Sequence, residues 1–145
     1  MDLDKVSVRH LVVSNAPAPA DGGIVRGSMG EIAQIVNGDA FRFLAFIEFA
    51  MIDGGYRGNH YHLNKIENLY VISGRLKAFY HDLDTDETAS MELKAGDLVK
   101  ILPRCAHVYF PLEHSQAVEF GEEPFDPSDT IRYVVTDGPE KTHEC

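Results

Sequence analysis

Cysteine, long apolar runs and positive charge are all scarce in this sequence of 145 residues. Its two cysteines, Cys105 and Cys145, give no disulfide framework, which suits a reducing compartment. No apolar stretch approaches the roughly 20 residues that span a membrane. The first ten residues also lack the basic and apolar regions of a signal peptide. These absences predict a cytoplasmic protein without a membrane partner.

The shortage of positive charge limits the partners further. Lysine and arginine number 13 against 23 aspartates and glutamates, so the net charge is −10. Such a chain repels nucleic acid and anionic membrane surfaces. We therefore expect a small-molecule partner, and a few local arginines or lysines would have to meet any anionic substrate.

Helical periodicity is also scarce, and short strands separated by turn residues take its place. This pattern predicts an all-β sandwich or barrel. At this length we expect one domain over residues 1–145, with an amino-terminal strand and loop over 1–25 and a frayed tail over 137–145. Strands are expected at 6–13, within 26–35, and at 41–51, 59–63, 67–73, 75–81, 88–93, 97–102, 107–110, 116–120 and 131–136.

The expected strand 41–51, FRFLAFIEFAM, is apolar on both faces. A strand of a one-sided sheet alternates more cleanly between apolar and polar residues. The second apolar face predicts a homodimer interface. Cover from the amino-terminal strand or from a loop is the alternative.

The most informative motif is Gly-x5-His-x-His-x4-Glu-x6-Gly, formed by Gly54, His60, His62, Glu67 and Gly74. Two histidines separated by one residue point to the same face of a strand. A carboxylate on the following strand can close on them, and the glycines fit the flanking turns.

A second cluster adds His107, which follows Gly96 with ten residues between them. Three imidazoles and one carboxylate suit one divalent metal ion, with Zn, Fe, Mn, Ni and Co as candidates. If no metal binds, His60 or His62 would act as the acid and base. Cys105 alternates with His107, so it is either a small buried hydrophobe or a further reactive group.

The two motifs resemble those of the cupin superfamily, and the first is matched at every fixed position. This resemblance implies a cupin double-stranded β-helix, a jelly-roll barrel, with the metal held by His60, His62, Glu67 and His107. The second motif is matched in spacing but not at every fixed position. Arg104 stands where the family usually has glycine, which puts the local backbone and pocket shape in question.

Three further segments resemble nucleotide-sugar epimerases and isomerases of the cupin type. Arg57-Gly58-Asn59-His60 and the Arg26-to-Glu31 segment are similar to segments of epimerases acting on keto sugars. The segment from Glu123 to Thr130 is similar to the carboxy-terminal cupin domain of capsular-sugar enzymes. The resemblance implies an isomerase or epimerase acting next to a carbonyl. The proposed substrate-binding residues are Arg57 and Arg26, for a diphosphate, with Lys65 and Tyr70.

Two other functions compete with this interpretation. A dioxygenase can use Fe, Ni or Mn at the same ligands, and oxygen uptake would distinguish it. A non-catalytic small-molecule-binding cupin is the other alternative. No pair of DNA-binding helices accompanies the expected barrel, so a transcription factor is not favoured.

Overall fold

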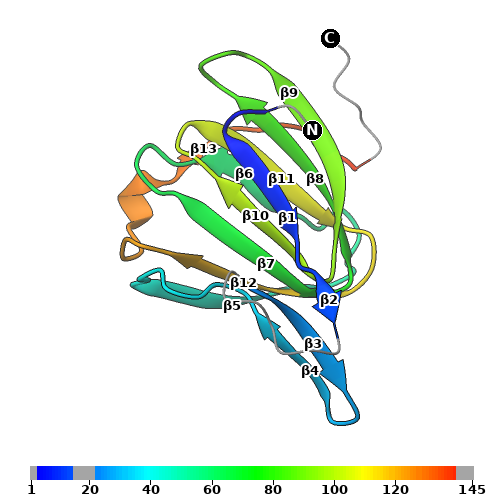
Figure 1. The fold of residues 1–145 in the computed structure, drawn as a ribbon. Coiled ribbons are helices and arrows are strands. Elements are labelled where there is room, and N and C mark those ends of the chain that lie inside the picture. The colour runs from blue at the N-terminus through cyan, green and yellow to red at the C-terminus, as the bar shows by residue number, and fades with distance from the viewer. Residues whose placement is uncertain (1–2, 15–21, 140–145) are drawn as a thin grey trace.

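The structure of the protein, a computed structural model, describes residues 3–14 and 22–139, and the regular secondary structure in these ranges is almost entirely β-strand (Figure 1). The strands are β1 (Val6–His10), β2 (Val13–Ser14), β3 (Gly23–Gly27), β4 (Gly30–Gln34), β5 (Phe43–Phe49), β6 (Arg57–Tyr61), β7 (Glu67–Ser73), β8 (Arg75–Asp82), β9 (Thr88–Lys94), β10 (Asp97–Ile101), β11 (Cys105–Pro111), β12 (Ser115–Gly121) and β13 (Ile131–Arg132). One 3-10 helix, Pro127–Asp129, precedes β13.

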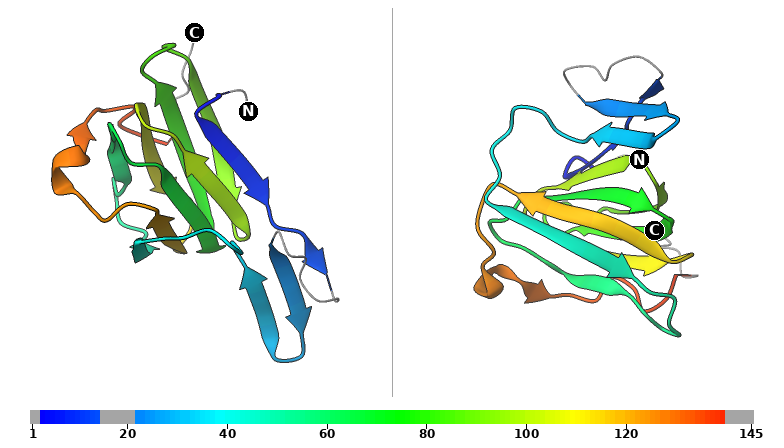
Figure 2. Two further views of the ribbon diagram at one scale, coloured as in Figure 1. Left: turned by 60° about the vertical axis from the view of Figure 1, so that its left-hand side comes forward. Right: turned by 90° about the horizontal axis from the view of Figure 1, so that it is seen from below.

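Two antiparallel five-stranded sheets face each other (Figures 1 and 2). One has the order β1-β10-β7-β12-β5 and the other β13-β6-β11-β8-β9. Side chains alternate across each strand, so every second residue points between the sheets. The expected all-β barrel is therefore confirmed.

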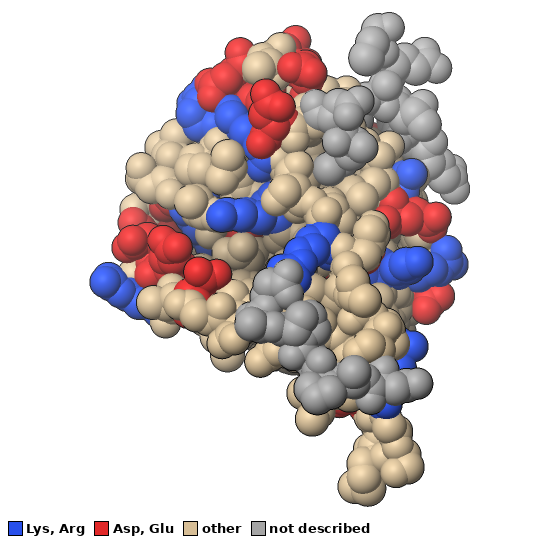
Figure 3. All heavy atoms as spheres, viewed as in Figure 1, with Lys and Arg blue, Asp and Glu red and all other residues tan. Residues whose placement is uncertain are grey.

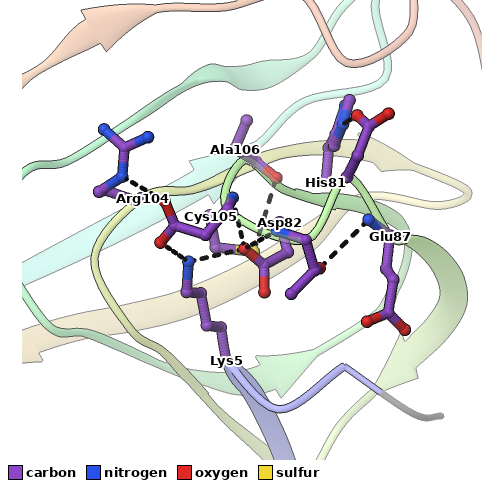
Figure 4. Close-up of polar contacts among 10 residues, drawn as sticks. Lys5, His81, Asp82, Glu87, Arg104, Cys105 and Ala106 are labelled. Carbon is purple, nitrogen blue, oxygen red and sulfur yellow. Dashed lines mark hydrogen bonds and ion pairs between the residues drawn. The ribbon is translucent and has the colours of Figure 1, made fainter.

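The main core fills the space between the two sheets. Val71, Leu76, Tyr80, Leu93 and Val99 are fully buried there. Near β1 an ion pair ties the amino-terminal segment to the end of β8. Lys5 Nζ lies 2.6 Å from the buried carboxylate of Asp82, as Figure 4 shows.

A third, smaller sheet of β2, β3 and β4 projects from the barrel (Figure 2). The predicted strand 6–13 is interrupted because Leu11 N–H donates to Gly96 O, while Val12 O accepts from Ile24 N–H. The chain thus leaves the main sheet for the small one. The strand expected within 26–35 is present as β4, but its partner β3 was not predicted.

The carboxyl-terminal strand 131–136 is shorter than predicted, and only Ile131–Arg132 pairs with β6. Tyr133 N–H donates to Asn59 O, and Val135 N–H donates to the Asn59 side-chain oxygen at 2.9 Å. After Arg132, hydrogen bonds to the single buried residue Asn59 thus take the place of regular strand pairing with β6. The expected loop 15–23 and the tail 137–145 fall largely outside the described residues.

The outer face of β5 is exposed, with Leu44 at 73% and Phe46 at 62% exposed. In the view of Figure 3, acidic side chains lie at the top of the molecule, where a turn joins β8 to β9. The tip of the projecting β3–β4 hairpin shows mostly uncharged residues. None of the described helices is long and apolar enough to cross a membrane.

Candidate active site

The strands β6, β7 and β11 bring the four predicted ligands together. His60 lies opposite His107 in the β6–β11 ladder, and His62 follows β6 directly. Glu67 begins β7 in the facing sheet. One candidate ligand atom from each residue lies within 4.8 Å of all the others. The four side chains that the motif spacing predicted to lie together are therefore close in the structure.

The carboxylate of Glu67 lies between two imidazoles. Its Oε1 is 3.4 Å from His62 Nε2, and its Oε2 is 3.2 Å from His107 Nε2. Both Nε2 atoms are buried and lack a well-directed hydrogen bond. Buried polar atoms without a partner are costly, so two at one point indicate a ligand-binding centre.

The outer nitrogens of the same imidazoles fix the ring orientations. His62 Nδ1–H donates to the backbone carbonyl of Asp129 at 2.8 Å, and His107 Nδ1–H donates to the carbonyl of Cys105 at 3.0 Å. A carbonyl only accepts, so each Nδ1 carries a proton, and in the neutral ring each Nε2 keeps its lone pair. Hydrogen bonds of this kind orient the histidine ligands of metals.

Electrostatics keep the centre suited to a cation. Burial opposes the charge of Glu67, but the neighbouring His107 and His62 hold its pKa well below the usual value, and Glu67 in turn raises the pKa of His107 against the effect of burial. Burial and the neighbouring His107 lower the pKa of His60 to about 4, so its ring is neutral near pH 7. A deprotonated carboxylate and neutral imidazoles are the forms that bind metals, and these residues fit a divalent ion.

A pocket of about 440 Å³ opens beside the centre. Its walls include Ile47 and Phe49 of β5, with Arg57 at the start of β6. The Arg57 guanidinium lies 5.7 Å from the Phe49 ring centroid, and its Nε–H donates to Glu48 O at 2.9 Å. Arg57 therefore lies in the pocket wall, where the sequence predicted a substrate contact.

Glu119, which sequence reasoning missed, faces the same pocket from β12. Lys65 Nζ lies 2.5 Å from Glu119 Oε1 and 4.0 Å from Glu67 Oε1. Burial, reinforced by the nearby Glu67 charge, raises the pKa of Glu119 to about 7, although Lys65 opposes the shift. A sequence signal was available, because Glu119 alternates with the apolar Ala117 in the expected strand 116–120, and the structure buries Ala117 completely.

Tyr109 forms another part of the pocket that was not predicted. Its hydroxyl and that of Tyr80 are buried without a well-directed hydrogen bond. Burial raises the pKa of Tyr109 well above the usual value, so the hydroxyl remains a donor at neutral pH.

Asp129 supports the site from the 3-10 helix. Its carboxylate accepts hydrogen bonds from the backbone N–H groups of Leu63 at 2.7 Å and Lys65 at 2.9 Å. Together with its carbonyl bond to His62, this fixes the turn between β6 and β7. The segment from Glu123 to Thr130 therefore contacts the site through Asp129, which has a structural role.

Two predicted substrate contacts lie elsewhere. Tyr70 is three residues after Glu67, so alternation turns it to the other face of the sheet, where it packs with Leu11, Ile24 and Phe120. Arg26 lies on the projecting hairpin, and its Nε–H donates to Glu31 at 3.0 Å. Within one copy, neither residue joins the four ligands.

Arg104 and Cys105 lie near Lys5 and Asp82, as Figure 4 shows. Arg104 has φ of +63°, the left-handed region in which glycine is favoured, and its N–H donates to His62 O at 2.7 Å. Its side chain meets Asp84 instead of the pocket. Cys105 lies in the main core, and burial raises the pKa of its thiol to about 12, as for a small buried hydrophobe.

The profile of the family described as "Polysaccharide biosynthesis C-terminal domain" matches residues 25–130. This range includes all four candidate ligands and Glu119. No curated protein sequence matches the chain closely enough to count as a relative.

Solved structures of cupin-type sugar enzymes share the fold. A mutant of the 3,4-ketoisomerase QdtA from Thermoanaerobacterium thermosaccharolyticum, in complex with TDP-4-keto-6-deoxyglucose, has a TM-score of 0.71 at 17% identity, covering 90% of this chain and 89% of that one. The TDP-quinovose 3,4-ketoisomerase WlaRB from Campylobacter jejuni gives 0.70 at 14% identity, with 90% and 94% covered. The dTDP-4-dehydrorhamnose 3,5-epimerase from Sulfolobus tokodaii gives 0.63 at 16% identity, with 74% and 70% covered. The cupin jelly-roll fold is therefore confirmed.

Proposed function

The chain belongs to the family of the polysaccharide biosynthesis C-terminal domain, and from this premise we propose that it is an isomerase or epimerase. Its substrate would be a nucleotide-linked keto sugar, and the reaction would take place next to the carbonyl. The observation that carries the proposal is the pocket, in which Glu119, paired with Lys65, lies beside the His–Glu centre. The similar folds of sugar ketoisomerases and an epimerase support the substrate class.

The chemistry requires a group that moves a proton. A base removes the proton from the carbon next to the carbonyl, and the electron pair moves onto the carbonyl oxygen. Returning a proton to the same carbon from the other face gives an epimer. Returning it to the former carbonyl carbon gives an isomer, because the hydroxyl on the first carbon then gives its proton to the former carbonyl oxygen and becomes the new carbonyl. Glu119 is the proposed base, because it is the carboxylate of the pocket that is not a candidate metal ligand, and Lys65 holds it in place.

We also propose that His60, His62, Glu67 and His107 hold one divalent metal ion, with Zn, Fe, Mn, Ni or Co as candidates. When bound, the metal supplies Lewis acidity that stabilises negative charge on the carbonyl oxygen. The chain's own residues would bind, orient and deprotonate the sugar. If the protein uses no metal, His60 or His62 is the proposed acid or base, and of these two His60 lines the pocket.

The diphosphate of the substrate is assigned to Arg57. A guanidinium grips phosphate oxygens with two parallel hydrogen bonds, and Arg57 is exposed at the pocket wall. Arg26 remains a second candidate only if another copy of the chain carries it to the pocket. Homodimerisation, expected from the apolar outer face of β5, and a cytoplasmic location remain proposals.

Elemental analysis of untagged protein, purified without added metal, tests the ligand set. We expect near-stoichiometric metal in the parent and in His114→Ala, a matched control because His114 is exposed and pairs with Glu48. His62→Ala and Glu67→Ala should lose it while keeping the β-sheet circular dichroism of the parent. Retention by both variants would overturn the assignment.

Product analysis tests the reaction. TDP-4-keto-6-deoxyglucose is incubated with the protein, and the sugar is followed by NMR. Formation of a 3-keto or epimerised sugar, lost in Glu119→Gln, is expected. The three-histidine and one-glutamate donor set also suits a redox-active metal, so oxygen uptake is recorded in parallel. Uptake without sugar rearrangement would favour the dioxygenase instead.

A further inference from the structure

Within the described residues, four buried side-chain atoms lack a well-directed hydrogen bond, and all four lie at or beside the His–Glu centre. Two are the Nε2 atoms of His62 and His107, and two are the hydroxyls of Tyr80 and Tyr109. A metal ion would satisfy the imidazoles, because each offers a lone pair. A neutral phenol instead has a proton to donate, so the tyrosines need an acceptor that the metal does not supply.

Tyr80 and Tyr109 are neighbours on the inner face of one sheet. Tyr80 on β8 lies opposite His107 in the ladder with β11, and Tyr109 is two residues further along β11, on the same face. The ring centroids of the two tyrosines are 6.4 Å apart, and the Tyr109 ring lies 5.9 Å from that of His107. The strand register therefore places both hydroxyl-bearing rings beside one proposed metal ligand.

The two hydroxyls carry more protons than they can use between them. Burial raises the pKa of both, and the next largest influence on each is the other tyrosine. A hydrogen bond between two neutral hydroxyls uses one proton and leaves the other. Tyr80 is completely buried, whereas Tyr109 is 4% exposed and lines the pocket. Donation from Tyr80 to Tyr109 is favoured, because the proton left over is then on the pocket side instead of deep in the apolar core.

The walls around Tyr109 do not accept this remaining proton. Glu67 and Glu119 both line the pocket, yet neither makes a hydrogen bond with the Tyr109 hydroxyl. The nearby walls also include the apolar side chains of Phe49 and Leu69, and the Phe49 ring lies edge-on to Tyr109 with centroids 6.3 Å apart. An acceptor for Tyr109 therefore has to come with the ligand that fills the pocket.

We propose that Tyr109, oriented by Tyr80, donates a hydrogen bond to an oxygen of the bound sugar, either a hydroxyl or the carbonyl. This inference rests on the proposed function, because it takes the sugar to be the group that enters the pocket. Tyr109 contacts the substrate, and Tyr80 is a positioning residue that acts through it. A site built to hydrogen-bond a substrate oxygen rejects an analogue without that oxygen, since the buried donor is then left unpaired. The tyrosine pair thus selects a sugar with an oxygen beside Tyr109.

Calorimetric titration with TDP and with TDP-4-keto-6-deoxyglucose tests this contact, because only the second ligand carries the sugar. All proteins contain Glu119→Gln, which keeps conversion of the sugar slow. Adding Tyr109→Phe should raise the Kd of the sugar nucleotide about tenfold, the loss of one hydrogen bond, and leave the Kd of TDP unchanged. Tyr80→Phe should act in the same direction but less strongly.

Tyr133→Phe is the matched control, because the Tyr133 hydroxyl lies 3.1 Å from His81 Nδ1, outside the pocket. It should change neither Kd. Sugar binding that is as tight in Tyr109→Phe as in its background, or an equal loss for TDP and for the sugar nucleotide, would overturn the Tyr109 contact alone. Failure of the background protein to bind the sugar nucleotide more tightly than TDP would contradict the proposed function, and the inference with it.

Urea unfolding in EDTA provides a second, ligand-free measurement. The double variant Tyr80→Phe/Tyr109→Phe should keep or raise the urea midpoint of the parent, because replacing both hydroxyls removes a buried donor that has no acceptor in the free protein. Tyr133→Phe should lower the midpoint, since its hydroxyl has a partner. A midpoint lowered at least as far in the double variant as in Tyr133→Phe would show that a buried water or another group already satisfies the pair, and would overturn the proposal.

Discussion

At the residue scale, the site depends on which nitrogen of each imidazole carries a proton. Carbonyl acceptors on Asp129 and Cys105 accept from Nδ1–H, so the Nε2 atoms of His62 and His107 face the Glu67 carboxylate. The sequence could predict that these side chains meet, because a two-residue spacing selects one face of a strand. It could not predict the acceptors, since both are backbone groups whose positions depend on the fold.

Glu119 shows what local reasoning overlooked. The sequence interpretation favoured Lys65 and Tyr70 because they are near the ligands along the chain. Lys65 does pair with Glu119 and lies near Glu67, whereas Tyr70 lies behind the sheet. Glu119 is 52 residues from Glu67 along the chain, and only the pairing of β12 with β7 brings them together. Proximity in sequence was a poorer guide than the inward position of a charged residue in an apolar strand.

Replacing Glu119 by glutamine should change how stability depends on pH. The pKa of Glu119 rises from 4.5 to about 7 on folding, so the native state binds more protons between these values. Its contribution is fully present below about pH 4.5 and is lost as pH rises through 7. Relative to the parent, Glu119→Gln should therefore gain on the order of 2–3 kcal/mol between pH 4.5 and 7.5.

Urea unfolding in EDTA at several pH values measures this difference without interference from metal. Glu122→Gln, at an exposed position just after β12, is the control and should parallel the parent. A constant difference between Glu119→Gln and the parent across the pH range would show that Glu119 is not in the environment described.

At the element scale, a bulge between β6 and β11 places His60. The ladder pairs His107 with His60 but Val108 with Gly58, so Asn59 is the extra residue. Asn59 has φ of +59°, and its side-chain oxygen accepts a hydrogen bond from Val135 N–H. Bulges often redirect side chains near active sites. The predicted strand 59–63 contained the right histidines, but no periodicity in the sequence could reveal the extra residue.

Gly58 is needed for this bulge, and Gly58→Ala should destabilise the protein by about 1–3 kcal/mol. Its φ is +110°, and an added Cβ would lie 2.6 Å from the His107 carbonyl oxygen. Gly54→Ala is the matched control, because φ is +71° there but nothing lies within 4 Å of the added Cβ. Urea unfolding of both variants measures the difference. An equal loss of stability would contradict the close approach of β6 to β11.

At the scale of the whole molecule, most of the architecture followed from the sequence. Short strands with inward alternation predicted the barrel, and turn residues located most strand ends. The small sheet could not be predicted from the sequence, because β3 contains two glycines and pairs with β2, which has only two residues. Its stability comes from Ile24 and Leu11 packing on Phe120, a contact across distant parts of the chain.

The proposed metal should stabilise the folded molecule as a whole, because its ligands come from both sheets. A ligand that binds only the native state at 100 times its Kd adds about 2.7 kcal/mol, which for this length raises Tm by roughly 5–10 °C. Thermal unfolding with and without Zn should show this shift in the parent and in His114→Ala. His62→Ala should show none. A shift in His62→Ala equal to that of the parent would indicate metal binding elsewhere.

The most direct test of the proposed proton transfer is deuterium incorporation into TDP-4-keto-6-deoxyglucose in D2O, followed by proton NMR. We expect the parent protein to replace hydrogen at a carbon next to the carbonyl, or to form a 3-keto sugar carrying deuterium at the former carbonyl carbon. Glu119→Gln should slow this exchange at least a hundredfold, whereas Glu122→Gln should not. An unchanged sugar without deuterium beyond the spontaneous rate, in the presence of protein loaded with each candidate metal, would contradict the account.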